Sequence, residues 1–205
     1  MKIAIFGGTF DPPHLGHLNI VEEVLNSKVV DKIVIIVSYK PPHKTGQKVS
    51  NFDQRCEMLE LAFKKLIESN NKVSISRIEE ERADKLSYTF DTFKELQKKY
   101  PEDELCLLVG SDSLMQLHSW YKAQELATNY KIITYPRPDY KINETKLIKC
   151  WNKSLVEKFL ENTVNFPVKL CASSEIREKI SQNEDVSTLL SSEVLCYINS
   201  NKLYL

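Results

Sequence analysis

The chain has 205 residues, a length that suits one domain, or one domain with a small C-terminal addition. Its 28 basic and 28 acidic residues cancel, so we expect no electrostatic attraction to nucleic acid or to an anionic membrane. We expect a cytoplasmic protein without a disulfide framework or a membrane span, because the five cysteines form no CxxC pair and the longest apolar run is 33–37.

Short apolar runs with strand character alternate with stretches of helical periodicity along the chain. Strands are predicted at 2–6, 33–37, 73–78, 105–109 and 131–134. Helices are predicted at 15–25, 52–67 and 88–99, with a helix or a broken helix pair around Trp120 at 113–127. After a polar, turn-rich boundary at 136–144, the pattern predicts a helix at 145–162, a short strand at 168–171, and helices at 174–182 and 192–199.

This alternation predicts right-handed βαβ units and therefore a single α/β domain over 1–205, a doubly wound parallel sheet with a small C-terminal helical part. Ligands of such sheets bind beyond the carboxyl ends of the strands. We therefore expect the functional residues in the segments that follow the strands, which are 7–17, 38–44, 78–92, 110–113, 134–138 and 171–177.

The first of these segments, 7–17, holds three of only five glycines, where average usage of ~7% gives about 14. Gly7 and Gly8 follow a buried strand and let the backbone approach a ligand closely, and Thr9 adds a hydroxyl group. Neither GxGxxG nor GxxxxGK[ST] occurs here, so the dinucleotide-binding fingerprint and the P-loop are excluded.

Two histidines stand at the start of the next predicted helix. Asp11 is the expected N-cap, and the helix begins at about 12–14, so His14 and His17 share a face of its first turn with Gly16 between them. An isolated pair would more often be surface or packing residues, but the coincidence with the glycine turn favours a site for phosphate oxygens. No metal site is expected, because no third histidine, nearby cysteine or carboxylate pair supplies the remaining ligands.

Two later loops carry residues that can meet a nucleotide. Lys40, His43 and Lys44 follow the second predicted strand and suit an anionic phosphate, although a lysine-rich loop alone is more often a solvated turn. Gly110 permits close approach of backbone to ligand, and Asp112 can accept hydrogen bonds from ribose hydroxyls or serve as an N-cap.

Two further features have both a structural and a functional interpretation. Trp120 lies among polar residues, where its indole can stack on a flat ring or cover the edge of the core. Ser173 and Ser174 open a predicted helix with Arg177 one turn later, which suits a second anion site.

The segment GGTFDPPHLGH at 7–17 resembles the N-terminal signature of the nucleotidylyltransferase superfamily with the HxGH motif. The segments KPPHK at 40–44, SYTFDT at 87–92, GSDSL with a following tryptophan at 110–120, and SSEIR at 173–177 resemble one branch, the bacterial nicotinate-nucleotide adenylyltransferases. The resemblance extends from residue 2 to about residue 180. The HxGH motif alone indicates only the superfamily, whereas the whole set in this order is specific.

The resemblance implies a Rossmann-like fold and adenylyl transfer from ATP to nicotinate mononucleotide, with Mg²⁺ carried by ATP and 136–205 as a C-terminal subdomain that completes the ATP site. It implies that Trp120 stacks on the nicotinate ring, whose carboxylate meets backbone amides near Thr89 and Tyr121. The residues expected to catalyse are His14, His17, Lys44 and Arg177. The residues expected to bind ATP are Gly7, Gly8, Thr9, His14, His17, Gly110, Asp112, Arg137, Ser173, Ser174 and Arg177. The residues expected to bind the mononucleotide are Lys40, His43, Lys44, Thr89, Trp120 and Tyr121.

The nucleophile of this reaction is the mononucleotide's own phosphate, whose second pKa near ~6 makes a general base unnecessary. The chemistry then needs positioning and positive charge, and His14, His17, Lys44 and Arg177 are expected to supply that charge together with the helix N-termini. The sequence leaves three alternatives open, which are nicotinamide mononucleotide as acceptor, phosphopantetheine as acceptor, and a non-catalytic nucleotide sensor. It also allows a homo-oligomer.

Overall fold

The computed structural model describes residues 1–41, 49–82, 84–138, 140–169 and 171–205. A five-stranded sheet forms its centre, in the order β3-β2-β1-β4-β5. The strands are β1 (Lys2–Gly8), β2 (Lys32–Val37), β3 (Val73–Ser76), β4 (Glu104–Gly110) and β5 (Lys131–Tyr135). The helices are α1 (Leu15–Asn26), α2 (Phe52–Ser69), α3 (Thr89–Lys99), α4 (Ser111–Gln116), α5 (Ala123–Asn129), α6 (Glu144–Cys150), α7 (Lys153–Glu161), α8 (Ser173–Ser181) and α9 (Ser192–Ser200), with 3₁₀ turns η2 (Ile78–Arg82) and η3 (Leu117–Ser119).

The four strand pairs of this sheet are all parallel, as predicted. Ile5 of the central strand β1 faces Val34 of β2 on one side and Leu107 of β4 on the other. The chain adds β2 and β3 on one side of β1 and then β4 and β5 on the other. The strand order therefore reverses at β1, and this switch point is where such sheets open a crevice for ligands.

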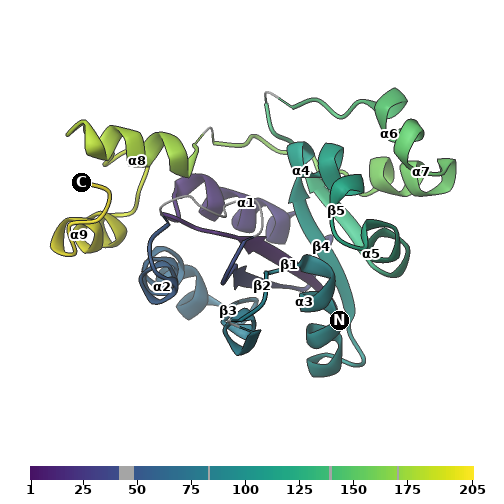
Figure 1. Ribbon diagram of the computed structural model, residues 1–205, viewed down its shortest axis with the longest axis horizontal. Helices are drawn as coiled ribbons and strands as arrows, with labels where there is room; N and C mark the ends of the chain where they lie inside the picture. Colours follow the sequence, from purple (N-terminus) through teal and green to yellow (C-terminus); the bar gives the residue numbers. More distant parts are fainter. Residues whose placement is uncertain (42–48, 83, 139, 170) are drawn as a thin grey trace.

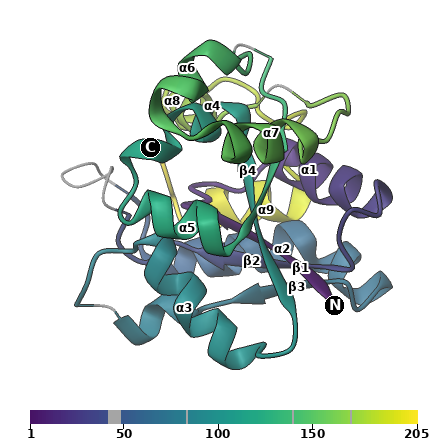
Figure 2. The ribbon, with the colours of Figure 1, turned by 90° about the vertical axis from the view of Figure 1, so that its right-hand side faces the viewer.

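Helices cover both faces of the sheet, because its strands are apolar on both faces (Figures 1 and 2). Side chains alternate along β1, so Ile3 and Ile5 belong to one buried cluster while Ala4 and Phe6 belong to the other. The first cluster includes residues of α3, α4, α5, α6 and α7, and the second includes residues of α1 and α2.

The four helices after β5 pack in two different parts of the molecule. Helices α6 and α7 pack into the first cluster through Leu147 and Phe159, together with Trp151 between the two helices. Helices α8 and α9 pack on α2 in a separate cluster that includes Met58 and Ile176. Figure 1 shows the two pairs at opposite ends of the molecule. None of the helices described above is long and apolar enough to cross a membrane.

Two predicted elements need correction. The single helix expected at 145–162 is two helices, since the chain turns at Trp151 and Asn152 begins a new helix by accepting a hydrogen bond from the Leu155 amide (2.9 Å). The strand expected at 168–171 is wrong for its described residues, which are irregular; the Lys169 amide donates instead to the Asn19 side chain (3.1 Å). The broken helix pair around Trp120 is confirmed.

Candidate active site

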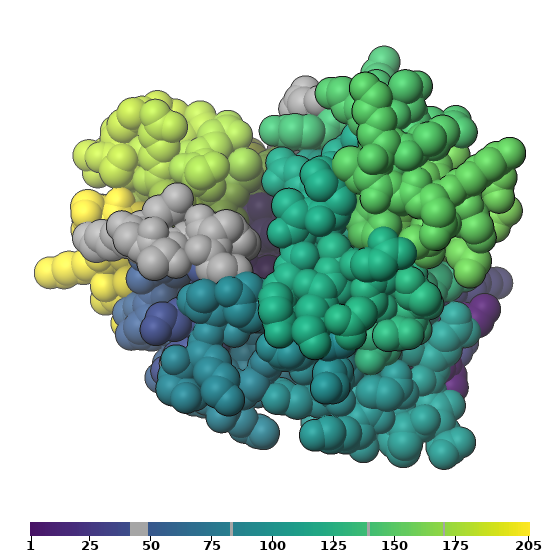
Figure 3. Space-filling view, turned by 45° about the vertical axis from the view of Figure 1, so that its right-hand side comes forward, coloured from purple at the N-terminus to yellow at the C-terminus, as the bar shows by residue number. Residues whose placement is uncertain are grey.

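A cleft of about 730 Å³ opens at the carboxyl ends of β1 and β4, at the switch point of the sheet. Figure 3 shows the molecule hollowed between α8, in yellow-green, and the teal segment that contains α4, with the purple N-terminal segment at the bottom. Its size is typical of a small-molecule site. The predicted site residues that line it are Gly7, Gly8, Thr9, His17, Thr89, Gly110, Asp112, Trp120, Tyr121, Arg137 and Ser173.

The remaining predicted site residues lie beside the cleft or outside the described part of the chain. His14 is buried behind His17, and Arg177 contacts the loop that leads to it. Lys40 and Ser174 are exposed and do not line the cleft. His43 and Lys44 fall within 42–48, outside the residues that the structure describes.

The two histidines cap helix α1 and stack on each other. The Nδ1 atom of His14 accepts a hydrogen bond from the His17 amide (3.3 Å), and the Nδ1 atom of His17 accepts one from the His14 amide (3.2 Å). Their ring centroids are 3.6 Å apart. His14 is therefore the N-cap, and the expectation of Asp11 in that role is wrong. Because both Nδ1 atoms accept, each neutral ring carries its proton on Nε2, at the opposite edge.

Both imidazoles are neutral near pH 7. Burial, with a smaller contribution from the Arg137 charge, lowers the pKa of His14 to about 3. Burial, followed by His14 and Arg137, also lowers the pKa of His17 well below its usual value. The pair therefore acts as two hydrogen-bond donors and does not supply the positive charge expected of it.

Two glycines leave room that these rings and their neighbours fill. A Cβ atom on Gly16 would lie 2.9 Å from His14 Nδ1 and 3.1 Å from the Lys169 carbonyl oxygen. A Cβ atom on Gly8 would lie 2.9 Å from the ring of Phe10, which in turn packs edge-on against His17 at 5.0 Å. A side chain on Gly16 would therefore displace His14, and one on Gly8 would displace the Phe10 ring that packs against His17.

The loop between β1 and α1 is tied down by residues far away in the sequence. The buried carboxylate of Asp11 accepts hydrogen bonds from the Tyr204 hydroxyl (2.7 Å) and from the Ser50 amide (3.4 Å). Arg177 donates to the Asp11 carbonyl oxygen (2.8 Å), and Ser173 Oγ donates to the carbonyl oxygen of Pro12, also at 2.8 Å. The loop is thereby fixed against α8 and the C-terminus.

The opposite wall of the cleft carries an ion pair at the end of β4. Asp112 Oδ1 and Arg137 Nε are 3.6 Å apart, and neither atom has a hydrogen-bond partner among the described residues. The Arg137 amide donates to Ser111 Oγ (2.8 Å), which fixes the start of this arginine segment. A Cβ atom on Gly110 would overlap the Asp112 carboxylate, so a side chain there would displace this group. The pair is placed to bind a polar ligand group.

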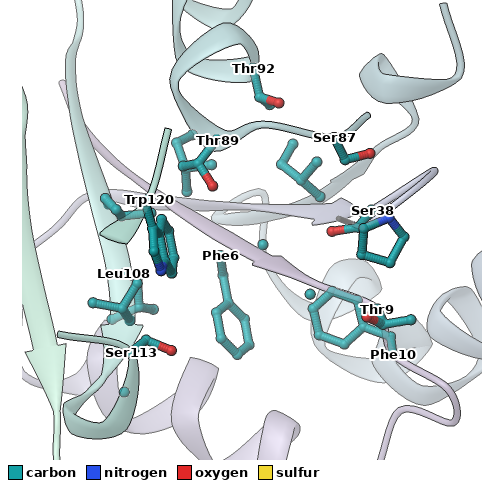
Figure 4. A pocket seen from close by; sticks show the side chains of 18 of the residues that line it. Phe6, Thr9, Phe10, Ser38, Ser87, Thr89, Thr92, Leu108, Ser113 and Trp120 are labelled. Atoms are coloured by element: carbon teal, nitrogen blue, oxygen red, sulfur yellow. The ribbon is translucent and has the colours of Figure 1, made fainter. Parts of the chain in front are cut away.

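Aromatic side chains form another part of the wall. Figure 4 shows the indole of Trp120 facing the cavity from the side opposite Thr9 and Phe10. The indole is half-buried against the core, whereas Tyr121 is 46% exposed and its ring packs at a tilt against that of Tyr88, with the centroids 4.6 Å apart. Trp120 therefore covers the edge of the core while its indole also lines the cleft.

A buried carboxylate that the sequence did not reveal borders the cleft. Glu79 is 5% exposed and accepts hydrogen bonds from the Tyr39 amide (3.1 Å) and from Thr92 Oγ1 (2.7 Å). It holds the chain that follows β2. In the sequence Glu79 begins a run of three glutamates, which reads as a solvated surface. Within the described ranges, no group of three or more histidine, cysteine or acidic side chains could hold a metal ion.

Comparisons with known proteins extend over the whole chain. The cytidylyltransferase-like family model matches residues 5–179. A probable nicotinate-nucleotide adenylyltransferase of Clostridium tetani is 35% identical over 205 residues, which cover 99% of this chain and 98% of the relative. The nicotinate-nucleotide adenylyltransferase of Bacillus subtilis is 34% identical over 203 residues, with the same coverage. The Plasmodium falciparum nicotinic acid mononucleotide adenylyltransferase complexed with NaAD shares the fold, with a TM-score of 0.79 at 22% identity over 99% of this chain and 97% of that one.

A parallel sheet whose ligand cleft opens where the strand order reverses is the architecture of an α/β nucleotidyltransferase, and the family match agrees with it. More narrowly, the chain belongs to the nicotinate-nucleotide adenylyltransferases of the cytidylyltransferase-like family, because the match to these relatives runs from end to end.

Proposed function

We propose that the cleft joins the adenylyl group of ATP to nicotinate mononucleotide, which gives deamido-NAD and pyrophosphate. One observation carries the proposal. His17 lines the cleft while its Nδ1 atom is occupied by the helix start, so the Nε2–H group remains for a phosphate oxygen of a bound nucleotide. A neutral donor held in this way stabilises charge that develops during phosphoryl transfer.

ATP is proposed to lie along the loop after β1 and the start of α8. Gly7 is open to the cleft, since a Cβ atom there would meet nothing within 4 Å, and Thr9 and Ser173 add hydroxyl groups. Arg137 and Arg177 supply the positive charge that the neutral histidines do not. Asp112 is suited to ribose hydroxyls because its Oδ1 atom lacks a hydrogen-bond partner among the described residues.

The mononucleotide is proposed to occupy the side of the cleft lined by Trp120 and Thr89. The indole offers a face for the pyridine ring. Thr89 is the first residue of α3, and its N-cap Tyr88 makes no side-chain cap, so the amides of this helix start suit the nicotinate carboxylate. Tyr121 lies beside them. Lys40, His43 and Lys44 are proposed to meet the mononucleotide phosphate.

In the reaction, a phosphate oxygen of the mononucleotide forms a bond to the α-phosphorus of ATP. The bond from that phosphorus to the bridging oxygen breaks, and pyrophosphate leaves with the electron pair. The protein's task is to align the two phosphates and to stabilise charge, and His17 Nε2–H and the arginines perform it. Mg²⁺ enters as part of the ATP substrate, held by phosphate oxygens and water.

The test is pyrophosphate release by the purified chain from ATP and Mg²⁺, with each candidate acceptor supplied in turn and the product identified by mass. The proposal expects nicotinate mononucleotide to give the highest kcat/KM. A higher kcat/KM with nicotinamide mononucleotide or phosphopantetheine would identify that compound as the acceptor instead. Binding of ATP without release of pyrophosphate for any acceptor would indicate a nucleotide sensor and contradict the enzyme.

A further inference from the structure

The side chain of Arg55, on the first turn of α2, is a cation buried inside the protein. It is 2% exposed and does not line the cleft. None of the ion pairs among the described residues includes it. A buried charge is costly unless it is hydrogen-bonded, so its partners indicate what it is for.

Those partners are four backbone carbonyl oxygens from two loops. Nη1 of Arg55 donates to Thr9 (2.9 Å) in the loop after β1 and to Ser38 (2.8 Å) after β2. Nε donates to Ser50 (3.0 Å), and Nη2 lies 3.4 Å from the carbonyl oxygen of Tyr39. One planar group therefore joins the chain that leaves β1 to both ends of the loop that leaves β2.

These two loops carry different substrates in the proposed function, on which this inference rests. Thr9 belongs to the ATP side, and the chain that continues from Tyr39 into Lys40 belongs to the mononucleotide side. We propose that Arg55 is a positioning residue that fixes the distance between the two loops, and thereby the alignment of the attacking phosphate with the α-phosphorus. Neither substrate needs to touch Arg55 for this role.

The shape of arginine matters to this role. A guanidinium presents five N–H donors in a rigid plane, whereas the lysine ammonium is a single point with three donors. Lysine at position 55 would keep the positive charge but could not reach all four carbonyl oxygens from one place. Each loop would still be able to bind its own substrate, yet the separation between them would no longer be fixed.

The experiment compares Arg55→Lys with wild type in three measurements. These are the dissociation constant of ATP alone, the dissociation constant of nicotinate mononucleotide alone, and kcat with both substrates saturating. We expect each dissociation constant to change less than ~3-fold and kcat to fall ~10–100-fold, because alignment affects only the joining step. A matched control is Arg77→Lys, whose guanidinium lies over the same Phe52 ring but is 38% exposed and pairs with surface carboxylates. Its three values should equal those of wild type.

A kcat of Arg55→Lys equal to that of Arg77→Lys would overturn the inference. The inference would also be overturned if kcat fell and both dissociation constants rose by the same factor, since that result indicates general loosening of the site. Arg55→Gln, which leaves no buried charge to satisfy, is measured beside it and should show the same split. If neither variant folds, Arg55 serves the fold itself and the positioning role is refuted. A wild-type chain that is inactive with both substrates would refute the proposed function instead.

Discussion

At the residue scale, the stacked histidines carry the first prediction. His17→Ala removes the Nε2–H donor, so kcat should fall ~100-fold or more while the fold is retained. His118→Ala is the matched control, because His118 is exposed on η3 and does not line the cleft. The measurement is steady-state kcat together with a thermal melt of both variants. A His17→Ala protein as active as the control would refute the role of the HxGH pair.

His14 also makes stability depend on pH. Its pKa falls from 6.5 to about 3 on folding, so the unfolded chain binds a proton below pH 6.5 that the folded protein does not. The stability is fully present above pH 6.5 and is lost as the pH falls toward 3. Between pH 7 and pH 5 this amounts to about 2 kcal/mol. Urea unfolding at the two pH values should show a loss larger by about that amount in wild type than in His14→Gln. Equal losses in the two proteins would contradict the assignment.

The local signals of the sequence were sufficient for part of the site. A few neighbouring residues are enough to identify Gly7, Gly8 and the HxGH spacing as candidates. The same holds for Trp120, which stands among polar residues. Arg55 and Tyr204 have no such signal. Arg55 stands in an ordinary amphipathic helix, and Tyr204 meets Asp11 across 193 positions in the chain. Local sequence patterns cannot predict a role that depends on contact between segments far apart in the chain.

At the scale of elements, the start of α1 is held by the C-terminal part of the chain. The Leu15 amide donates to the Leu189 carbonyl oxygen (2.9 Å), outside the intrahelical pattern. Arg177 of α8 and Tyr204 after α9 both bond to Asp11. The expectation of Asp11 as N-cap failed because this carboxylate is directed toward Tyr204, which left the capping position to His14. The last helices therefore support the histidine pair.

Removing the Tyr204 hydroxyl tests that support. Burial and the Asp11 carboxylate raise the pKa of Tyr204, so the phenol stays protonated and donates. Tyr204→Phe would leave a buried carboxylate oxygen without its shortest hydrogen bond, and we expect a loss of about 1–3 kcal/mol in unfolding free energy by urea titration. Tyr140→Phe, at a hydroxyl-bearing ring that is 53% exposed, should lose less than ~0.5 kcal/mol. A loss no greater than in this control would mean that the bond contributes nothing.

At the scale of the whole molecule, the parallel sheet and its five strands before residue 136 are confirmed, because β-branched strands and amphipathic helices are encoded by local periodicity. The division of 136–205 was not predicted. Helices α6 and α7 extend the core beside β5, while α8 and α9 pack on α2. Both helix pairs bury apolar side chains, and the periodicity that predicts such a helix does not say which surface it covers. The cleft lies between the two groups (Figure 3).

This arrangement predicts which amides a ligand protects. A bound nucleotide that spans the cleft contacts α8 on one wall and the segment 110–121 on the other. Binding should therefore reduce local opening of the backbone hydrogen bonds on both walls. Hydrogen exchange with nicotinate mononucleotide and a non-hydrolysable ATP analogue should slow at least ~10-fold in α8 and in 110–121. The internal control is α6 with α7, which does not line the cleft and should exchange at its unliganded rate. Protection confined to 110–121 would mean that the ligand does not bridge the cleft, and that α8 lies outside the nucleotide site.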